Sequence, residues 1–375
     1  MNQQIPKLSP VERLDANLAG ADQAQPTSCL PETAPAPAAA PAVTSVAVIE
    51  TPESAASATA ASSAPPAPAE SAESDAPAAA SAPPAGPLSQ AREWSEMIKL
   101  EHTVFALPFA LSGLLLAVDK LPTWATVGWT ILAFAGARAA AMTLNRLIDA
   151  NYDALNPRTS TRAIPAGRIG RLPAAVFAFL SFALMIFAAV HLPPICVWLS
   201  PVAILWLSFY SFTKRFTWMC HFALGIAIAG AALGGWIAAG GSLAEPAPWI
   251  LALAVGTWVA GFDLIYACQD VDFDRGAALH SLPARFGVLG GLCVSTALHI
   301  VTLAALTALG VILSLGVAYW VGVAVVGSML LYEHTLVAPD DLSKVNAAFF
   351  TTNGFVSIGC FIAILIDRLV VALAR

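Results

Sequence analysis

Nine apolar runs of about twenty residues each follow one another between Trp94 and the carboxyl terminus. A helix of that length spans the hydrocarbon core of a bilayer and satisfies its own backbone polar groups there. The runs lie roughly at 98–118, 123–147, 172–190, 193–213, 219–239, 247–268, 287–309, 311–332 and 349–371. Hydrophobic residues make up 58% of the chain and charged residues 11%, far from the profile of a soluble domain. We therefore predict an all-α polytopic membrane protein with nine transmembrane helices.

The first 90 residues differ in composition from the rest of the chain. They are dominated by Ala, Pro and Ser, contain no aromatic residue, and repeat short Ala-Pro and Ser-Ala themes. Such a segment buries too little apolar surface to offset the entropy cost of folding. It also lacks the basic start and apolar core of a signal peptide. We predict a disordered cytosolic tail over 1–90 and a transmembrane domain over 91–375.

Basic residues are distributed unevenly between the loops that join the predicted spans. The loops after the second, fourth, sixth and eighth spans contain Arg158, Arg162, Arg168, Arg171, Lys214, Arg215, Arg275, Arg285 and Lys344. The opposite loops contain Lys120 and no other Lys or Arg. Because cytoplasmic loops carry the excess of Lys and Arg, we predict that the first group of loops faces the cytoplasm. No basic patch typical of nucleic-acid binding is present.

Two groups of polar and acidic residues lie at the cytoplasmic ends of the second and sixth predicted spans. The first group is Asn145, Asp149 and Asp153, and the second is Asp270, Asp272 and Asp274. Carboxylates brought together repel one another unless cations lie between them. Mg²⁺ binds carboxylate oxygens together with substrate phosphates. We predict that Asp149, Asp153, Asp270 and Asp274 hold Mg²⁺ against a diphosphate, with Asn145 assisting. The alternative is a set of polar residues that contact lipid headgroups.

Each group continues inward along its span to one further charged residue. Residues seven and eleven apart return to nearly the same face of an α-helix, so Arg138 shares a face with Asn145 and Asp149. Asp263 stands in the same relation to the second group. Charged residues inside a span usually face the bundle interior and pair. Two interpretations remain open, a structural Arg138–Asp263 ion pair and an Arg138 that binds the carboxylate of an aromatic acceptor. His102, Tyr266 and His221 are minor candidates for the pocket.

Two pairs of cations follow these spans in the cytoplasmic loops. Arg158 and Arg162 lie four residues apart, a spacing that lets both guanidinium groups fork onto phosphate oxygens. Lys214 and Arg215 form a second pair after the fourth span. We predict that both pairs bind the diphosphate. The alternative for each pair is an ordinary positive anchor at the membrane surface.

Three stretches of the sequence match motifs of one known family. They are Asn145-Arg146-Leu147-Ile148-Asp149-Ala150-Asn151-Tyr152-Asp153 with Asn156-Pro157-Arg158-Thr159 and Arg162, then Asp263-Leu264-Ile265-Tyr266-Ala267-Cys268-Gln269-Asp270 with Asp272 and Asp274, and Tyr210-Ser211-Phe212-Thr213-Lys214-Arg215. Together they resemble the UbiA superfamily of intramembrane aromatic prenyltransferases over about residues 95–370. Lys99-Leu100-Glu101-His102-Thr103, with Ala106-Leu107-Pro108-Phe109-Ala110, looks most like the 4-hydroxybenzoate branch.

The resemblance implies a fold, an activity and a location. It implies nine helices around a central cavity that is open to lipid. It also implies Mg²⁺-dependent transfer of a polyprenyl chain from polyprenyl diphosphate to an aromatic hydroxy acid, either 4-hydroxybenzoate or a dihydroxynaphthoate, in ubiquinone or menaquinone biosynthesis. The expected location is the bacterial plasma (inner) membrane, with the active site facing the cytoplasm.

Two other functions compete with this one. A secondary transporter with intramembrane acidic residues would also have many helices, but it tends to place its charged groups near the midplane. A phospholipid-headgroup transferase would also use Mg²⁺ and aspartates, but the Asp-Gly opening expected of that family is absent from the sequence. Only the prenyltransferase would yield a prenylated aromatic product.

Overall fold

The computed structural model describes residues 87–99 and 103–374. Their helices, in chain order, are α2 (Pro87–Met97), α3 (Thr103–Leu116), α4 (Trp124–Leu155), α5 (Arg171–Ala189), α6 (Pro194–Phe209), η3 (Tyr210–Arg215), α7 (Cys220–Ala238), α8 (Pro246–Ala267), η4 (Cys268–Asp270), α9 (Val271–Gly276), α10 (Leu282–Ile312), α11 (Val317–Thr335), η5 (Ala347–Thr352) and α12 (Asn353–Leu373). η3 and η4 are 3₁₀ helices, and η5 is a π-helical segment. Beyond helices, turns and loops, these ranges contain one isolated bridge between Ala338 and Asp341. The predicted all-α class is confirmed.

Eight helices in the described ranges are long and apolar enough to cross a membrane. They are Trp124–Leu155, Arg171–Ala189, Pro194–Arg215, Cys220–Ala238, Pro246–Gly276, Leu282–Ile312, Val317–Thr335 and Ala347–Leu373. α3 is also apolar but has only 14 residues. Each of the nine predicted spans coincides with one of these helices, and the chain is a multi-pass integral membrane protein.

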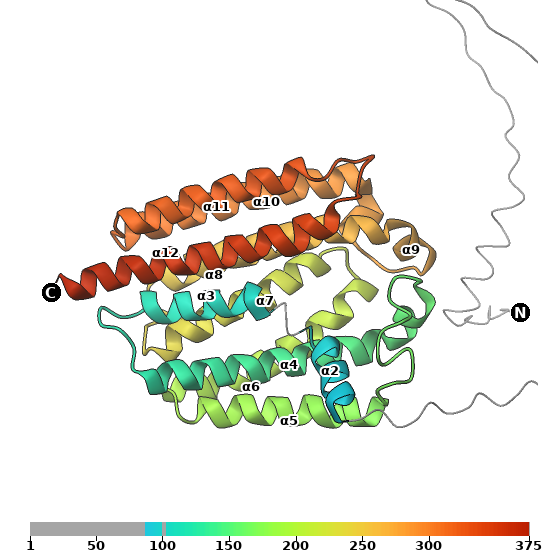
Figure 1. Ribbon diagram of the computed structural model, residues 1–375, viewed down its shortest axis with the longest axis horizontal. Helices are drawn as coiled ribbons and strands as arrows, with labels where there is room; N and C mark the ends of the chain where they lie inside the picture. The colour runs from blue at the N-terminus through green and yellow to red at the C-terminus, as the bar shows by residue number, and fades with distance from the viewer. Residues whose placement is uncertain (1–86, 100–102, 375) are drawn as a thin grey trace, which may run out of the picture. The chain divides into compact units, whose positions relative to one another are not determined.

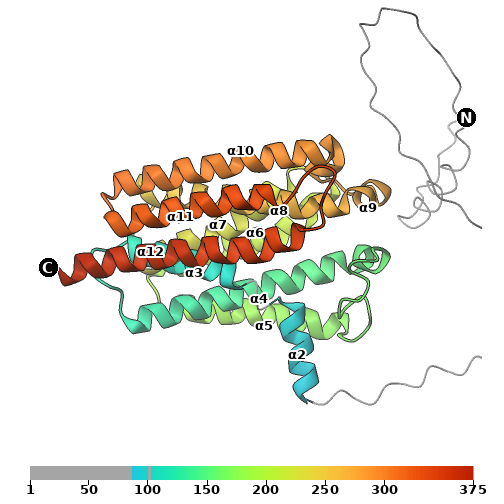
Figure 2. The ribbon, with the colours of Figure 1, turned by 45° about the horizontal axis from the view of Figure 1, so that its top comes forward.

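The predicted tail over 1–90 falls almost wholly outside the described residues. Its last positions, 87–90, form the start of α2. α2 runs across the long helices rather than alongside them (Figures 1 and 2). Trp94 of α2 packs on Phe177 of α5 with ring centroids 4.8 Å apart, and Glu93 lies 3.2 Å from the Arg168 guanidinium. α2 is therefore fixed to the same end of the bundle that carries the predicted acidic groups.

Short polar and conformational signals set the helix ends. The Thr123 hydroxyl caps α4 by accepting from the Thr126 N–H at 3.2 Å, and Ser281 caps α10 in the same way. Pro194 is the first residue of α6, and only residues 190–193 separate it from the end of α5 at Ala189. α4 continues to Leu155, beyond the predicted end at 147, so the first acidic group lies on regular helix.

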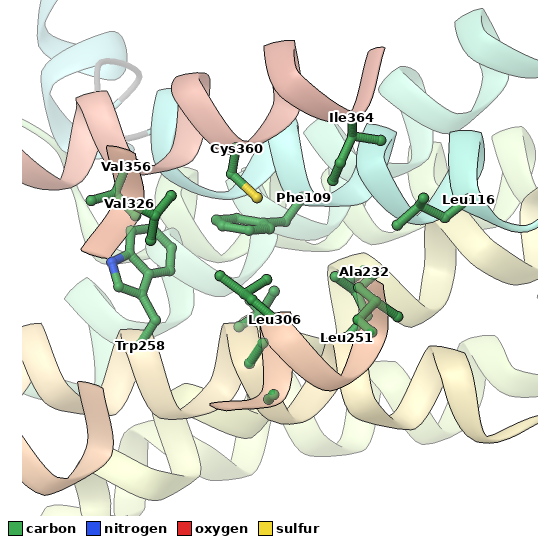
Figure 3. Close-up of a cluster of buried hydrophobic side chains, with 14 of the residues drawn as sticks. Phe109, Leu116, Ala232, Leu251, Trp258, Leu306, Val326, Val356, Cys360 and Ile364 are labelled. Atoms are coloured by element: carbon green, nitrogen blue, oxygen red, sulfur yellow. The ribbon is translucent and has the colours of Figure 1, made fainter. Parts of the chain in front are cut away.

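The apolar core lies between α3, α7, α8, α10, α11 and α12. Figure 3 shows Phe109, Trp258, Leu306 and Cys360 directed toward one another from four of these helices. Close backbone approach holds α3 against α7, because a Cβ at Gly235 would lie only 1.8 Å from the Ala110 carbonyl oxygen. Such small-residue contacts are the usual means of packing helices in lipid, where burial of apolar surface gives little drive.

The two ends of the bundle are distinct. The loop after α4 and the short α9 lie at one end, and the carboxyl end of α12 lies at the other (Figure 1). At that second end the Arg368 guanidinium donates to the Val118 carbonyl at 2.8 Å, which joins α12 to the loop after α3. We call the end with the α4 loop and α9 the carboxylate end.

Candidate active site

The first acidic group forms a buried polar stripe on the last turns of α4. Asp149 and Asp153 are only 3% and 6% exposed. The Asn145 amide donates to Asp149 Oδ2 at 3.2 Å and to Ser211 Oγ of η3 at 3.4 Å. The four-residue spacing on regular helix therefore brings these side chains together, as predicted.

Three predicted cations bind directly to this stripe. Lys214 Nζ lies 2.9 Å from Asp149 Oδ2, and the Arg215 guanidinium lies 3.6 Å from Asp149 Oδ1. One nitrogen of Arg162 donates to both carboxylate oxygens of Asp153, at 2.7 and 2.8 Å. The positive charge that compensates these carboxylates is therefore supplied by the protein's own side chains.

The second acidic group stands on a broken helix. α8 ends at Ala267, the 3₁₀ turn η4 carries Asp270, and α9 carries Asp272 and Asp274. A 3₁₀ turn advances about 120° per residue rather than about 100°. The prediction that Asp263, Asp270 and Asp274 lie on one face of a single regular helix was therefore wrong, because the helix is interrupted by the 3₁₀ turn. Asp272 is exposed.

Arg158 links the loop after α4 to the second acidic group. Its Nε donates to Asp270 Oδ1 at 3.0 Å, a second guanidinium nitrogen contacts Oδ2, and the third donates to the Tyr266 hydroxyl at 2.8 Å. Burial alone would lower the pKa of the Arg158 guanidinium, but the hydrogen bonds and charge of Asp270 raise it above its ordinary value. Arg158 is thus a permanently charged bridge from the α4 loop to α8.

Asn156 also joins the loop after α4 to the second acidic group, and sequence reasoning gave it no role. Its amide donates to Asp270 Oδ1 at 3.3 Å, and its own oxygen accepts from the Arg158 N–H at 2.9 Å. Its position before Pro157 could have indicated a role, because an Asn side chain there commonly hydrogen-bonds to the backbone of the following turn.

The two inner charged residues do not pair with each other. Asp263 Oδ2 lies 2.7 Å from His221 Nδ1 on α7. Of the two interpretations, the Arg138–Asp263 ion pair is therefore wrong, and Asp263 pairs with His221 instead. Arg138 donates to the Lys99 carbonyl at 3.4 Å, and its buried Nε has no hydrogen-bond partner among the described residues. His221 had been only a minor candidate. In the sequence, its imidazole lies at the start of an apolar span, where a polar side chain needs a hydrogen-bonding or charged partner. His102 lies outside the described residues.

An apolar cavity of about 550 Å³ extends inward from this site. Arg138, Tyr210 and Asp263 line the part nearest the carboxylate end. Leu192 and Trp249 line the opposite part, close to the other end of the helices. The ion-paired carboxylates and cations therefore lie at the carboxylate end, beyond the part of the cavity that Arg138, Tyr210 and Asp263 line, and we call this side of the cavity its entrance. A long hydrocarbon-like interior extends away from it.

The chemistry of the donor set fits a hard divalent cation. Asp149 Oδ1 is buried and has no hydrogen-bond partner among the described residues, which leaves a carboxylate oxygen for a ligand. In the same described ranges, no three His, Cys, Asp or Glu side chains already converge as a metal cluster. Lys214, Arg162 and Arg158 neutralise three of the four aspartates, so these carboxylates do not need a metal ion in order to lie close together.

Two similar proteins carry the same name. A 4-hydroxybenzoate octaprenyltransferase from Aliivibrio salmonicida is 26% identical over 285 residues, which cover 74% of this chain and 99% of that protein. A 4-hydroxybenzoate octaprenyltransferase from Vibrio atlanticus is 30% identical over 264 residues, covering 69% and 92%.

Solved structures and a family model give the same result. The apo structure of a UbiA homolog from Aeropyrum pernix K1 has a TM-score of 0.66 and 33% identity, covering 71% of this chain and 98% of that one. A UbiA homolog from Archaeoglobus fulgidus, solved bound to DMAPP and Mg²⁺, shares the fold at a TM-score of 0.61 and 18% identity, covering 76% and 100%. The model of the UbiA prenyltransferase family matches residues 106–357. The chain therefore belongs to the UbiA prenyltransferase family.

Proposed function

We propose that this prenyltransferase moves a polyprenyl chain from polyprenyl diphosphate to an aromatic hydroxy acid, either 4-hydroxybenzoate or a dihydroxynaphthoate, in ubiquinone or menaquinone biosynthesis. The observation that carries this proposal is a dense set of carboxylates and cations at the entrance of an apolar cavity. An entrance of this kind suits a diphosphate, and the cavity suits its hydrocarbon chain. The names of the relatives favour 4-hydroxybenzoate as the acceptor.

Asp149, Asp153, Asp270 and Asp274, with Asn145 assisting, are the residues that would hold Mg²⁺. The metal would supply positive charge that stabilises the departing diphosphate. This role matches Asp149 Oδ1, which is buried without a hydrogen-bond partner among the residues described. It also matches the Archaeoglobus fulgidus homolog, which was solved with Mg²⁺ and a prenyl diphosphate.

The cations at the entrance would change partners when the donor binds. Lys214, Arg162 and Arg158 now bind carboxylates at distances of 2.9 Å or less. Phosphate oxygens can replace those carboxylate oxygens, because guanidinium forks bind both in the same geometry. Charge grows on the diphosphate as its bond to the allylic carbon breaks. Cations already positioned there stabilise the transition state more than the ground state.

The reaction itself would be an electrophilic aromatic substitution. The C–O bond of the donor breaks, the allylic carbon bonds to the ring carbon beside the acceptor hydroxyl, and the ring loses a proton to regain aromaticity. The cavity must exclude water, which would otherwise capture the allylic cation. Arg138, at the inner edge of the charged region and with a buried Nε that lacks a partner in the described ranges, would orient the acceptor carboxylate.

Asp263 and Tyr266 would complete the substrate pocket beside Arg138. The His221 imidazole holds the Asp263 carboxylate, and the Tyr266 hydroxyl accepts from Arg158. Asp263 is thereby available to accept a proton from the acceptor. Tyr266 holds Arg158 in position for the diphosphate.

The decisive experiment offers both acceptors to purified protein in liposomes with Mg²⁺ and a polyprenyl diphosphate. Mass spectrometry of the products should show one prenyl chain added to a ring carbon of one acceptor. Products from the naphthoate alone would assign the chain to the menaquinone route. If neither acceptor is prenylated while the protein moves a solute across the bilayer, the transporter interpretation is correct. Labelling of single-cysteine variants in the basic loops would test the cytoplasmic orientation separately.

A further inference from the structure

Two exposed arginines beside the turn from α9 to α10 stand apart from the ion pairs of the carboxylate end. Five other loop cations there lie no more than 3.6 Å from a carboxylate, and they are Arg158, Arg162, Arg168, Lys214 and Arg215. Arg171 donates to the Asn151 side chain at 2.6 Å. Neither Arg275 nor Arg285 forms an ion pair with any residue that the structure describes. These two positive charges are therefore free to meet an anion from outside the protein.

The Arg285 guanidinium lies between two aromatic rings. Its central carbon is 5.6 Å from the Trp218 ring centroid and 5.3 Å from the Phe286 ring centroid. The two rings themselves meet edge to face, with centroids 5.6 Å apart. Cation–π contacts occupy the faces of a guanidinium and leave the N–H groups at its edge for other partners. The Arg285 side chain donates no hydrogen bond within the described part of the chain.

Arg275 is held next to Arg285 by a single hydrogen bond. Its Nε donates at 2.8 Å to the carbonyl of Ala284, the residue that precedes Arg285. The turn between the two arginines is itself fixed, because the His280 N–H donates to the Lys214 carbonyl at 2.7 Å. The two terminal nitrogens of Arg275 donate to none of the described residues. The turn thus presents two neighbouring guanidinium groups with unused donors.

Helix lengths give the depth of these residues in the bilayer. α7 has 19 residues, a rise of about 28 Å, which is close to the hydrocarbon thickness of about 30 Å. Trp218 lies just before α7, at the level where tryptophan side chains gather in membrane proteins. α10 has 31 residues, about 46 Å, so it extends beyond the hydrocarbon. The ring contact between Trp218 and Phe286 therefore places Arg285 in the headgroup layer.

Apolar side chains lie exposed beside the two arginines. Phe286 and Leu289 of α10 are 54% and 61% exposed, and Met219, next to Trp218, is 47% exposed. A free phosphate ion would use the arginines alone and leave these side chains uncovered. A phospholipid matches both parts of the surface, because its phosphate accepts from guanidinium groups and its acyl chains cover apolar side chains.

We propose that Arg275 and Arg285, together with Trp218, bind the headgroup of an anionic phospholipid in the leaflet at the carboxylate end. The phosphate accepts from the unused N–H groups of both arginines. A zwitterionic headgroup brings its own cation beside two arginines, so the site favours phosphatidylglycerol over phosphatidylcholine. The site lies outside the apolar cavity and does not depend on the proposed prenyl transfer.

Native mass spectrometry of the full chain in detergent measures this preference directly. Phosphatidylglycerol should bind more tightly than phosphatidylcholine, and Arg285→Gln should lower its affinity at least about tenfold, as loss of charge-assisted hydrogen bonds predicts. Arg171→Gln is the matched control, since it removes an exposed arginine from the same end, and it should change the affinity less than about twofold. Equal losses in both variants would reduce the binding to general surface charge and overturn the proposal. Equal affinity of the wild type for both lipids would also overturn it.

Two further measurements separate a phospholipid from a free phosphate and do not depend on the folding of a variant. Glycerol 3-phosphate should fail to displace bound phosphatidylglycerol, because it lacks acyl chains; displacement at equal concentration would make the site one for free phosphate esters. In liposomes, a phosphatidylglycerol with a diazirine beside its glycerol should label wild-type peptides that contain Trp218 or Phe286. Labelling that unmodified phosphatidylcholine competes away as well as phosphatidylglycerol does, or labelling confined to other helices, would refute the site.

Discussion

The ends of α4 and α8 carry similar residues on different backbones. On α4, Asn145, Asp149 and Asp153 follow a regular helix, and the two aspartates are buried. After α8, the backbone passes through a 3₁₀ turn before α9, and the Asp270 carboxylate accepts from Arg158 of the α4 loop. Regular helix fixes the spacing of carboxylates, while a broken helix lets loop residues decide where a carboxylate points. We therefore expect the α4 group to be the rigid half of the site and the α8 group the adjustable half.

The largest expected effect comes from metal removal, which acts on both halves together. Chelation with EDTA should abolish turnover, and added Mg²⁺ should restore it. Thermal stability should change by no more than about 2 °C, because Lys214, Arg162 and Arg158 already neutralise the carboxylates in the described arrangement. Turnover and melting temperature are measured on the same sample in detergent. A drop in melting temperature of about 10 °C or more would mean that the fold itself depends on the metal.

Removal of one carboxylate from each half comes next. Asp149→Asn and Asp270→Asn should each lower kcat by about 10² to 10³-fold, since each loses a charged oxygen that acts on the diphosphate. The Asp149 variant should also melt at a lower temperature than the Asp270 variant, because its carboxylate side chain is 4% rather than 18% exposed. Asp272→Asn is the matched control and should keep full activity, since Asp272 is exposed. Equal melting temperatures would remove the distinction between a rigid and an adjustable half.

Arg162 and Arg158 bind the two halves of the site with different contact geometries. Arg162 reaches both oxygens of Asp153 with a single nitrogen, whereas Arg158 uses three nitrogens on Asp270 and Tyr266. A lysine can reproduce one nitrogen but not a fork. Arg158→Lys should therefore lower kcat by about 10- to 100-fold, and Arg162→Lys by less than about tenfold. Full kcat in both variants would make these arginines membrane anchors only, and a larger loss in Arg162→Lys would reverse the assignment of the halves.

The sequence predicted the helices and the α4 group well because both depend on regular periodicity. Apolar length located every span, and four-residue spacing placed Asn145 beside Asp149. The α8 group was predicted less well, since nothing in its residues announces a 3₁₀ turn at Cys268–Asp270. The partner of Asp263 depended on tertiary packing of α7 against α8, which brings His221 to it and leaves Arg138 apart. Spacing within one helix cannot show which residue a neighbouring helix supplies.

Variants of Arg138 and Asp263 test whether these two inner charged residues have separate roles. Arg138→Gln should raise KM for the aromatic acid by about tenfold and leave KM for the prenyl diphosphate unchanged, because its guanidinium would lose the acceptor carboxylate alone. Asp263→Asn is the comparison, since the two residues do not pair in the structure. It should lower kcat rather than reproduce the Arg138 effect on KM. An unchanged acceptor KM in a stable Arg138→Gln protein would exclude the carboxylate role.

The smallest expected effect concerns the Tyr266 hydroxyl, which contacts the adjustable half through Arg158. The hydroxyl accepts from Arg158 at 2.8 Å, and the ring packs on Phe349 with centroids 4.3 Å apart. Tyr266→Phe keeps the ring contact and removes one hydrogen bond, which corresponds to a loss of about two- to tenfold in kcat. Arg158 would remain on Asp270 through its other two nitrogens, so the loss should stay well below that of Arg158→Lys.

If Tyr266 acts only by holding Arg158, the double variant Tyr266→Phe with Arg158→Lys should be no slower than Arg158→Lys alone. Fully additive losses would instead mean that the hydroxyl contacts a substrate directly, and Tyr266 would then belong to the chemistry rather than to the positioning of Arg158.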